Sequence, residues 1–332
     1  MKKIIDSPES YVNDMLRGIY IAHPDTLSYV NSDLRAMIRK QVIPSKVGIA
    51  TGGGSGHLPL FLGYIGDGMV DGCGVGEVFQ SSSAQQILSV TKAIDSGAGV
   101  LYVLGNYGGD KLNFELSAEM ASTESSIRTA TVIVKDDVAT TNPDNRRGVA
   151  GIFFVCKCAG AAAAEMMGLD EVTRIAKKAA DSVRTIGIAL SSCTIPRVGH
   201  PSFEIGDDEM EIGTGIHGEP GVYRGQFTTA KKIVEEMMDL ILKDMPLSKG
   251  SEVAVLVNGL GSTPLEEQYL AYNHVHTALT GRGLSIFHAY IGEFATSMEM
   301  AGISISVFNL DSELKYLLSK PAKTPFFSQA QL

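Results

Sequence analysis

The stretch Lys46-Val-Gly-Ile-Ala50, followed at once by Thr51-Gly-Gly-Gly-Ser-Gly-His57, decides the fold class of this chain. A short apolar run bounded by turn residues predicts a buried strand, and the glycines after it predict a turn. Ligands of open α/β sheets bind at the carboxyl ends of the strands. We therefore expect an α/β fold with a binding loop at residues 51–57.

Other short apolar runs alternate with helical patterns along the chain. The further predicted strands are residues 99–104, 131–134, 185–190, 253–257 and 303–308, and the predicted helices include residues 83–96, 151–167 and 169–183. Such alternation predicts two α/β domains, each with a central, largely parallel or mixed sheet flanked by helices. We place the first domain at residues 1–182 and the second at 183–332. Residues 192–224, rich in Gly and Pro, are expected to form a long functional loop region or a hairpin.

The composition bounds the classes of function. With 332 residues the chain has enough material for a sizeable core, and its formal net charge of −9 argues against direct nucleic-acid binding. The start of the chain lacks the apolar segment of a signal peptide, and no run of about 20 apolar residues follows, so we expect a cytoplasmic protein that does not span a membrane. The cysteines lack metal-site spacing and are expected to be buried thiols: Cys73, Cys156, Cys158 and Cys193.

The glycine-rich loop at residues 51–57 excludes some ligands. A Walker A loop requires Gly-Lys-Ser/Thr after its glycines, but His57-Leu-Pro59 stands there. A dinucleotide-binding loop requires a helix that starts inside the glycine run, and Pro59 is late for that start. The loop therefore favours a small polyhydroxy ligand over a nucleotide, with a purely structural turn as the alternative.

Asp110 is a second candidate, because it follows Gly108-Gly109 after the predicted strand at 99–104. A carboxylate at this edge of the sheet can accept a proton or a hydrogen bond from a sugar hydroxyl. The structural alternative is that Asp110 caps a helix beginning at Lys111.

His217 is the third candidate, within the glycine-framed loop Gly213-Thr-Gly-Ile-His-Gly-Glu-Pro-Gly221. A neutral imidazole nitrogen can add to a ketone carbon and give a hemiaminal, but it cannot continue to an imine. Glu219 is placed to hold the other ring nitrogen in one tautomer. The alternative is an ordinary loop histidine. The remaining histidines lack this glycine framing and are given no role: His23, His200, His274, His276 and His288.

Taken together, these loops resemble the K subunits of the phosphotransferase-dependent dihydroxyacetone kinases, the DhaK family. The resemblance covers nearly the whole chain. Its clearest stretches are Gly52-Gly-Gly-Ser-Gly-His57, Asn106-Tyr107 with Gly109-Asp110, Arg146-Arg-Gly-Val-Ala-Gly151 and Gly215-Ile-His-Gly-Glu-Pro-Gly221.

The resemblance implies a role for each candidate residue. His217 corresponds to the histidine that binds dihydroxyacetone covalently, and His57 and Asp110 correspond to the acid/base pair around its hydroxyl. Gly54, Ser55 and Gly56 correspond to loop positions that contact the substrate. The family also implies a homodimer whose K subunit holds no cofactor or metal, since the nucleotide is kept on a separate DhaL subunit.

Two departures from the family pattern concern phosphoryl transfer. Leu58 replaces a glutamate of the family loop, and Gly105 replaces a lysine whose cation would stabilise charge on a transferring phosphoryl group. This favours a non-catalytic coactivator of the DhaQ type, which binds the ketone and partners a TetR-type transcription activator. The alternative is a working kinase K subunit that partners a DhaL subunit, for dihydroxyacetone or another short ketose.

Overall fold

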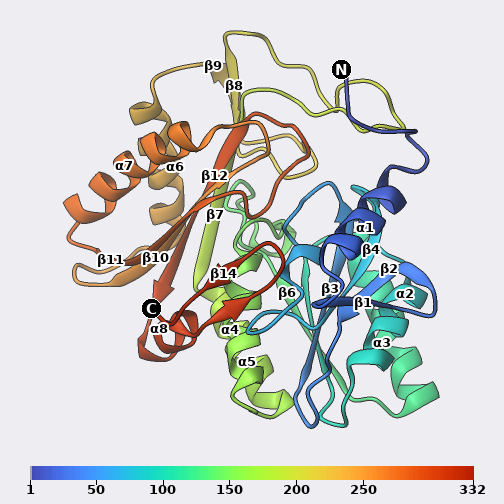
Figure 1. Cartoon of the computed structure of the whole chain (residues 1–332). Helices are drawn as coiled ribbons and strands as arrows, with labels where there is room; N and C mark the ends of the chain where they lie inside the picture. Colours follow the sequence, from blue (N-terminus) through green and yellow to red (C-terminus); the bar gives the residue numbers. More distant parts are fainter. Residues whose placement is uncertain (1) are drawn as a thin grey trace. The chain divides into compact units, whose positions relative to one another are not determined.

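A computed structural model describes residues 2–332 of the chain, which form two compact units (Figure 1). Unit 1 contains the described residues up to Val134 together with Ile152–Ala180 and Leu314–Leu332, and unit 2 contains Lys135–Gly151 and Asp181–Glu313. The chain changes unit after Ala180, close to the division placed at 182, but residues 135–151 and 314–332 group across that division. Periodicity assigns a segment to a helix or a strand and not to a neighbour in space, so it carries no signal for this exchange.

Unit 1 is built on a six-stranded mixed sheet of order β1-β2-β4-β3-β5-β6. Strands β4, β3, β5 and β6 are parallel, and β2 and β1 continue the sheet antiparallel at one edge. The bounds are β1 Leu27–Val30, β2 Asp33–Arg39, β3 Gly48–Ser55, β4 Gly72–Val78, β5 Val100–Gly105 and β6 Thr129–Val134. β3 continues to Ser55, so most of the glycines predicted as a turn extend the strand.

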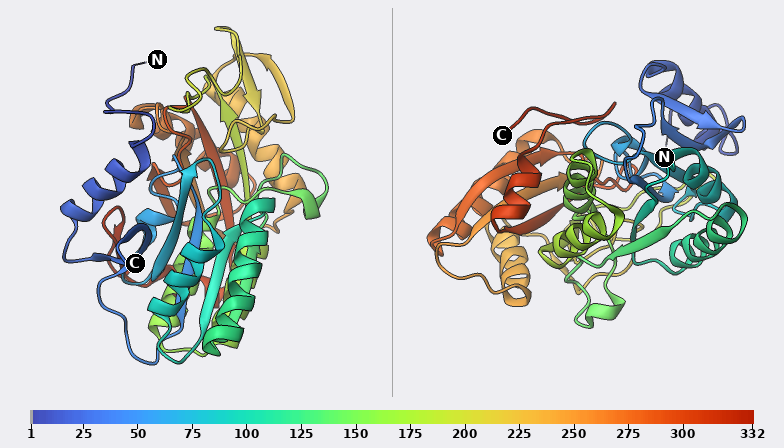
Figure 2. Two further views of the ribbon diagram at one scale, coloured as in Figure 1. Left: turned by 90° about the vertical axis from the view of Figure 1, so that its right-hand side faces the viewer. Right: turned by 90° about the horizontal axis from the view of Figure 1, so that it is seen from below.

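Helices cover both faces of this sheet. α2 (Ala84–Ile94) and α3 (Gly108–Ser125) lie side by side on one face, where Ile87 and Phe114 share a core with Tyr102 of β5 (Figure 2). α4 (Ile152–Ala164) also packs on β3 and β5 and is buried along almost its whole length, as is typical of an apolar helix. The other elements are α1 Tyr11–Ala22, η1 Leu62–Tyr64, α5 Leu169–Asp181, α8 Ser312–Ser319, β13 Ala322–Lys323 and β14 Ser328–Gln329.

Unit 2 has its own six-stranded mixed sheet, of order β11-β10-β12-β7-β8-β9. Only β10 and β11 are parallel neighbours. The helices α6 and α7 supply Met237 and Val275 to the core over Val255 of β10 and Ile305 of β12. The bounds are η2 Pro143–Asn145, β7 Val183–Ala189, β8 Glu209–Ile212, β9 Tyr223–Gln226, α6 Ala230–Asp244, β10 Glu252–Gly259, α7 Leu265–Gly281, β11 Ser285–Gly292 and β12 Gly302–Leu310.

The predicted fold class is confirmed, since both units are α/β with mixed sheets flanked by helices. The hairpin prediction for residues 192–224 is confirmed as well, because β8 and β9 pair antiparallel around the His217 loop. The four cysteines are buried. Over residues 2–332, none of the helices has both the length and the apolar character needed to cross a bilayer.

Candidate functional site

The glycine-rich loop of unit 1 is shaped by close backbone packing. A Cβ on Gly53 would lie 2.4 Å from a ring carbon of Phe61, and one on Gly54 would lie 2.7 Å from the backbone nitrogen of Gln80. Gly56 has φ +97°, a conformation that a side chain disfavours. The glycines at these positions therefore let the end of β3 approach its neighbours, whatever ligand the loop holds.

Ser55 and His57 are both buried in this loop. The Ser55 hydroxyl donates to the carbonyl oxygen of Gly76 at 2.7 Å. The His57 ring is only 1% exposed and stacks on Phe79 at a centroid distance of 4.9 Å, with Phe61 edge-on at 6.3 Å. Two aromatic side chains thus fix the plane of this imidazole, which lies buried in the predicted binding loop. A cavity of about 10 Å³ adjoins the ring, which is room for one water.

Asp110 lies in the first turn of α3 and is 5% exposed. The structural alternative, a cap for a helix starting at Lys111, is wrong, because α3 begins at Gly108 and its N-cap residue is Tyr107. A carboxylate in the first turn is stabilised by the N–H groups and the dipole of the helix. Burial is the main cause that raises the pKa of the Cys73 thiol, with smaller contributions from Cys156 and from the negative charge of Asp110.

The surroundings of Cys73 show that Asp110 and His57 lie near one another. Asp110 is close enough to Cys73 to affect its titration, and Cys73 lines the same small cavity as His57. This agrees with the topology, since β3 and β5 are parallel neighbours and their carboxyl ends meet at one edge of the sheet. Unit 1 thus brings His57 and Asp110 to one region.

His217 lies in unit 2, in the loop between β8 and β9, and its side chain is 22% exposed. Its Nδ1 is 2.8 Å from Oε1 of Glu219, and its backbone N–H donates to Oε2 of the same carboxylate at 3.0 Å. The expected contact between Glu219 and the ring is confirmed. One carboxylate holds both the ring and the backbone of His217.

The charge state of Glu219 fixes the tautomer of this ring. Burial alone would raise the Glu219 pKa, but the hydrogen bond and charge of His217 and the charge of Arg147 lower it to about 2. An ionised carboxylate only accepts hydrogen bonds, so Nδ1 carries the ring proton. In the neutral ring Nε2 then keeps its lone pair, as a nucleophile requires.

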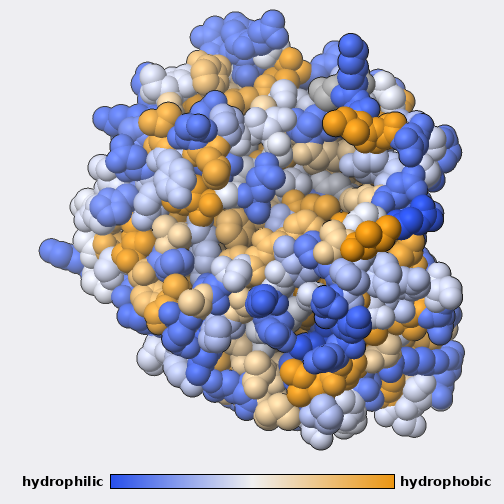
Figure 3. Space-filling model, viewed as in Figure 1, coloured by the Kyte–Doolittle hydropathy of each residue, from blue (hydrophilic) through white to orange (hydrophobic). Residues whose placement is uncertain are grey.

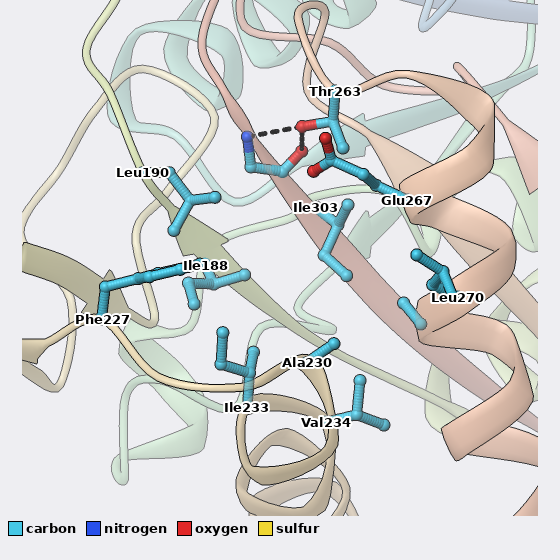
Figure 4. Close-up of a pocket in the computed structure, with 12 residues that line it drawn as sticks. Ile188, Leu190, Phe227, Ala230, Ile233, Val234, Thr263, Glu267, Leu270 and Ile303 are labelled. Atoms are coloured by element: carbon cyan, nitrogen blue, oxygen red, sulfur yellow. Dashed lines mark hydrogen bonds between the residues drawn. The ribbon is translucent and has the colours of Figure 1, made fainter.

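A larger cavity in unit 2, of about 110 Å³, does not suit a polyhydroxy ligand (Figure 4). Its wall is mostly apolar and includes Ile188, Ile233 and Ile303. The Thr263 hydroxyl is engaged by Gly302, whose N–H donates to it at 2.8 Å and whose carbonyl accepts from it at 2.7 Å. The candidate residues are not among those that line it.

Two of the apolar side chains that line this cavity are exposed. Phe227 and Leu270 are 55% and 57% exposed. Figure 3 shows hydrophobic and hydrophilic residues interspersed over the face it displays. Within the part of the chain that the structure describes, no cluster of His, Cys, Asp and Glu has the arrangement of a metal site.

Sequence reasoning assigned no role to Arg147 and Asp137, although Arg147 lies in one of the stretches that carry the family resemblance. In unit 2 the Arg147 guanidinium contacts Asp137, Gly213 and the Glu219 carboxylate. The two adjacent arginines at 146 and 147 were the available signal, but the contacts of Arg147 with Gly213 and Glu219 join residues that are distant in sequence.

Comparison with known proteins places the chain in a family. Residues 17–326 match the model of the Dak1 domain. The chain belongs to the Dak1 family. This Dak1 protein is 43% identical, over 98% of its length and 99% of the relative's, to the dihydroxyacetone-binding subunit DhaK of PTS-dependent dihydroxyacetone kinase 2 of Listeria innocua.

Two solved structures match the Dak1 protein closely in fold. The dihydroxyacetone kinase of C. freundii superposes with a TM-score of 0.92 at 30% identity, covering 99% of this chain and 60% of the kinase. The dihydroxyacetone kinase operon co-activator DhaQ superposes with a TM-score of 0.88 at 31% identity, covering 96% and 98% of the two chains. A kinase and a co-activator thus match at nearly equal identity.

Proposed function

We propose that this Dak1 protein binds dihydroxyacetone, or a ketose of similar length, by reversible addition of His217 to the ketone carbon. The observation that carries the proposal is the contact between Nδ1 of His217 and the ionised carboxylate of Glu219. It leaves the Nε2 lone pair directed away from the carboxylate and able to attack a carbonyl carbon. The choice of substrate is supported by the relatives, which are a dihydroxyacetone-binding subunit and a co-activator of a dihydroxyacetone kinase operon.

The addition loses no atom. Nε2 forms a bond to the ketone carbon, the π pair of the carbonyl moves to its oxygen, and that oxygen takes up a proton as the ring gives one up. Glu219 stabilises the positive charge that the ring carries during the addition. The adduct therefore has the mass of the protein plus the intact ketone, whereas an imine would have lost water.

We assign His57 and Asp110 to the ketose hydroxyl. Asp110 would accept the hydroxyl proton or hold it by a hydrogen bond, and His57 would assist from the ring plane that Phe79 fixes. The loop residues Gly54, Ser55 and Gly56 would contact the substrate, and the close packing of the glycines there supports a rigid loop.

We further propose that the chain acts as a coactivator rather than a kinase subunit, with a TetR-type activator as its partner. The observation in favour is Gly105 at the end of β5, where the family pattern has a lysine. Without that cation the transferring phosphoryl group loses an electrostatic contribution of several kcal/mol, roughly the size of one lost oxyanion-hole donor. Ketone binding does not need this contribution.

The second candidate is the K subunit of a PTS-dependent kinase, with a DhaL subunit as partner. It is favoured by the 43% identity to a DhaK subunit over essentially the full length of both chains. In either function the homodimer stays a prediction from the family resemblance.

Two experiments test these proposals. Intact-mass spectra under mild conditions, with increasing dihydroxyacetone, should show the adduct in the wild type and not in His217→Ala. An incubation with a DhaL subunit, the phosphotransfer proteins that recharge its nucleotide, and phosphoenolpyruvate then separates the two candidates. Phosphorylated ketone at the rate of a working K subunit would refute the coactivator, and adduct without turnover would refute the kinase.

A further inference from the structure

The loop that carries His217 is supported by an arginine that the proposed addition does not use. Arg147 lies in the segment of unit 2 at residues 135–151, and its side chain is 13% exposed. Its Nη2 donates to the carbonyl oxygen of Gly213 at 2.6 Å, where the chain leaves β8. Its Nη1 is 4.0 Å from Oε2 of Glu219. One guanidinium therefore contacts both the start of the loop and the carboxylate that holds His217.

Asp137 holds this guanidinium in place. Nε and Nη2 of Arg147 lie 2.7 Å and 2.6 Å from Oδ2 of Asp137. The other oxygen of Asp137 accepts from the backbone N–H of Ala139 at 2.9 Å, and the side chain is 2% exposed. Burial raises the Asp137 pKa to about 6, against the opposing charge of Arg147. Two rigid contacts thus fix the plane and the position of the arginine.

Gly215 makes the packing of these groups specific. A Cβ on Gly215 would lie 2.1 Å from Oε2 of Glu219 and 2.6 Å from Nη1 of Arg147. The carboxylate and the guanidinium therefore both pack over the bare Cα of this residue. Glu219 is confined between the glycine, the arginine and His217, and has little freedom to turn away from the ring.

We infer that Arg147, anchored by Asp137, is a positioning residue that holds Glu219 in the orientation which keeps the His217 ring proton on Nδ1. At 4.0 Å the contact with Glu219 acts mainly through charge, while the contact with Gly213 fixes the distance between the arginine and the loop. That Arg147 promotes ketone addition rests on the proposed function. That Arg147 keeps the His217 ring proton on Nδ1 does not depend on it.

The test compares Arg147→Gln with Arg146→Gln. Arg146 is a matched control, because it is the adjacent residue, is also buried, and pairs instead with the Asp244 carboxylate of α6 through both terminal nitrogens. The ¹⁵N shifts of the His217 ring report the tautomer, and intact-mass titration with dihydroxyacetone reports the dissociation constant of the adduct. We expect Arg147→Gln to populate the Nε2–H tautomer and to weaken the adduct roughly tenfold, as supporting partners of a reactive group do. Arg146→Gln should change neither readout, and Arg147→Lys should restore part of both.

A double variant tests whether Arg147 acts through Glu219. Adding Arg147→Gln to Glu219→Gln should weaken the adduct no further, because the coupled pair has already lost its function. If Arg147→Gln does not fold, Asp137→Asn replaces it, since it removes the charge that anchors the Arg147 guanidinium. An unchanged tautomer and affinity in Arg147→Gln, or fully additive effects in the double variant, would overturn the inference. A wild type without adduct whose ring tautomer still responds to Arg147→Gln would instead refute the proposed function alone.

Discussion

Replacing Glu219 by glutamine removes a charge from the His217 contact with little change in size. The carboxylate accepts two hydrogen bonds from His217, at 2.8 Å from the ring and 3.0 Å from the backbone. An amide has a single acceptor oxygen, so Glu219→Gln keeps at most one of these bonds and turns an N–H group toward the other donor. A hydrogen bond to a charged group contributes about 1.5–3 kcal/mol to stability.

The expected effect on ketone binding follows from that free energy. Since about 1.4 kcal/mol corresponds to a factor of ten, the dissociation constant of the adduct should rise roughly ten- to a hundredfold. Intact-mass titration with dihydroxyacetone measures it. The matched control is Glu211→Gln, because Glu211 of β8 accepts from Gly221 N–H at 2.7 Å and pairs with Arg224, and so supports the same hairpin without holding the ring.

The control separates loss of the ring contact from loss of the hairpin. Glu211→Gln is expected to lower the thermal stability of the hairpin while the ring of His217 keeps its tautomer. If Glu219→Gln binds the ketone within about twofold of the wild type, or if the two variants weaken binding equally, an ionised Glu219 is not what prepares His217 for addition.

Four further predictions follow from single positions. Gly54→Ala should destabilise unit 1 by about 1–3 kcal/mol, because its methyl group would overlap the backbone of Phe79 and Gln80. Gly108→Ala, with open space around it, should not destabilise the unit. Thermal unfolding measures both variants. The Glu219 pKa is about 2 in the folded chain against a usual 4.5, which corresponds to a contribution of about 3 kcal/mol to the free energy of unfolding. This contribution is complete above pH 4.5 and is lost as the pH falls through 2. Urea unfolding measured against pH should show this loss in the wild type and not in Glu219→Gln. Asp110→Asn should leave the mass adduct intact while abolishing any phosphoryl transfer that reconstitution with a DhaL subunit and the phosphotransfer proteins detects. Gly105→Lys should raise that transfer if the missing cation limits it, and equal rates in wild type and variant would contradict the coactivator argument.

The parts of the fold that sequence predicts are the strands buried on both faces. β5 and the middle of β10 are continuous apolar runs, and both are buried along almost their whole length. β4 was missed because three of its seven residues are glycines. A Cβ on Gly72 would lie 2.6 Å from Val90 of α2. The close packing of this helix therefore requires glycine where a strand usually has a β-branched residue, and the sequence pattern of a strand is lost.

In the candidate site, contacts between residues close in sequence could be predicted, and contacts between distant residues could not. His217 and Glu219 are two residues apart, so their contact could be expected from the loop sequence alone. Arg147 reaches Gly213 across 66 residues of sequence, a contact that only the fold creates. The alternative start of α3 at Lys111 was wrong because Asp110 is a favourable cap residue, whereas the helix begins three residues earlier without a side-chain cap.

Ketone binding and phosphoryl transfer make separate physical demands on this chain. Addition to a ketone needs an imidazole whose proton is held on one nitrogen, and unit 2 supplies this through Glu219 and Arg147. Transfer also needs a positive charge where the phosphoryl group develops negative charge, and the family resemblance implies a lysine for this role at the position of Gly105 in unit 1. A tight adduct without phosphoryl transfer is therefore the expected result when the chain is reconstituted with a DhaL subunit and its phosphotransfer proteins, and transfer in that assay would require another group to supply the cation.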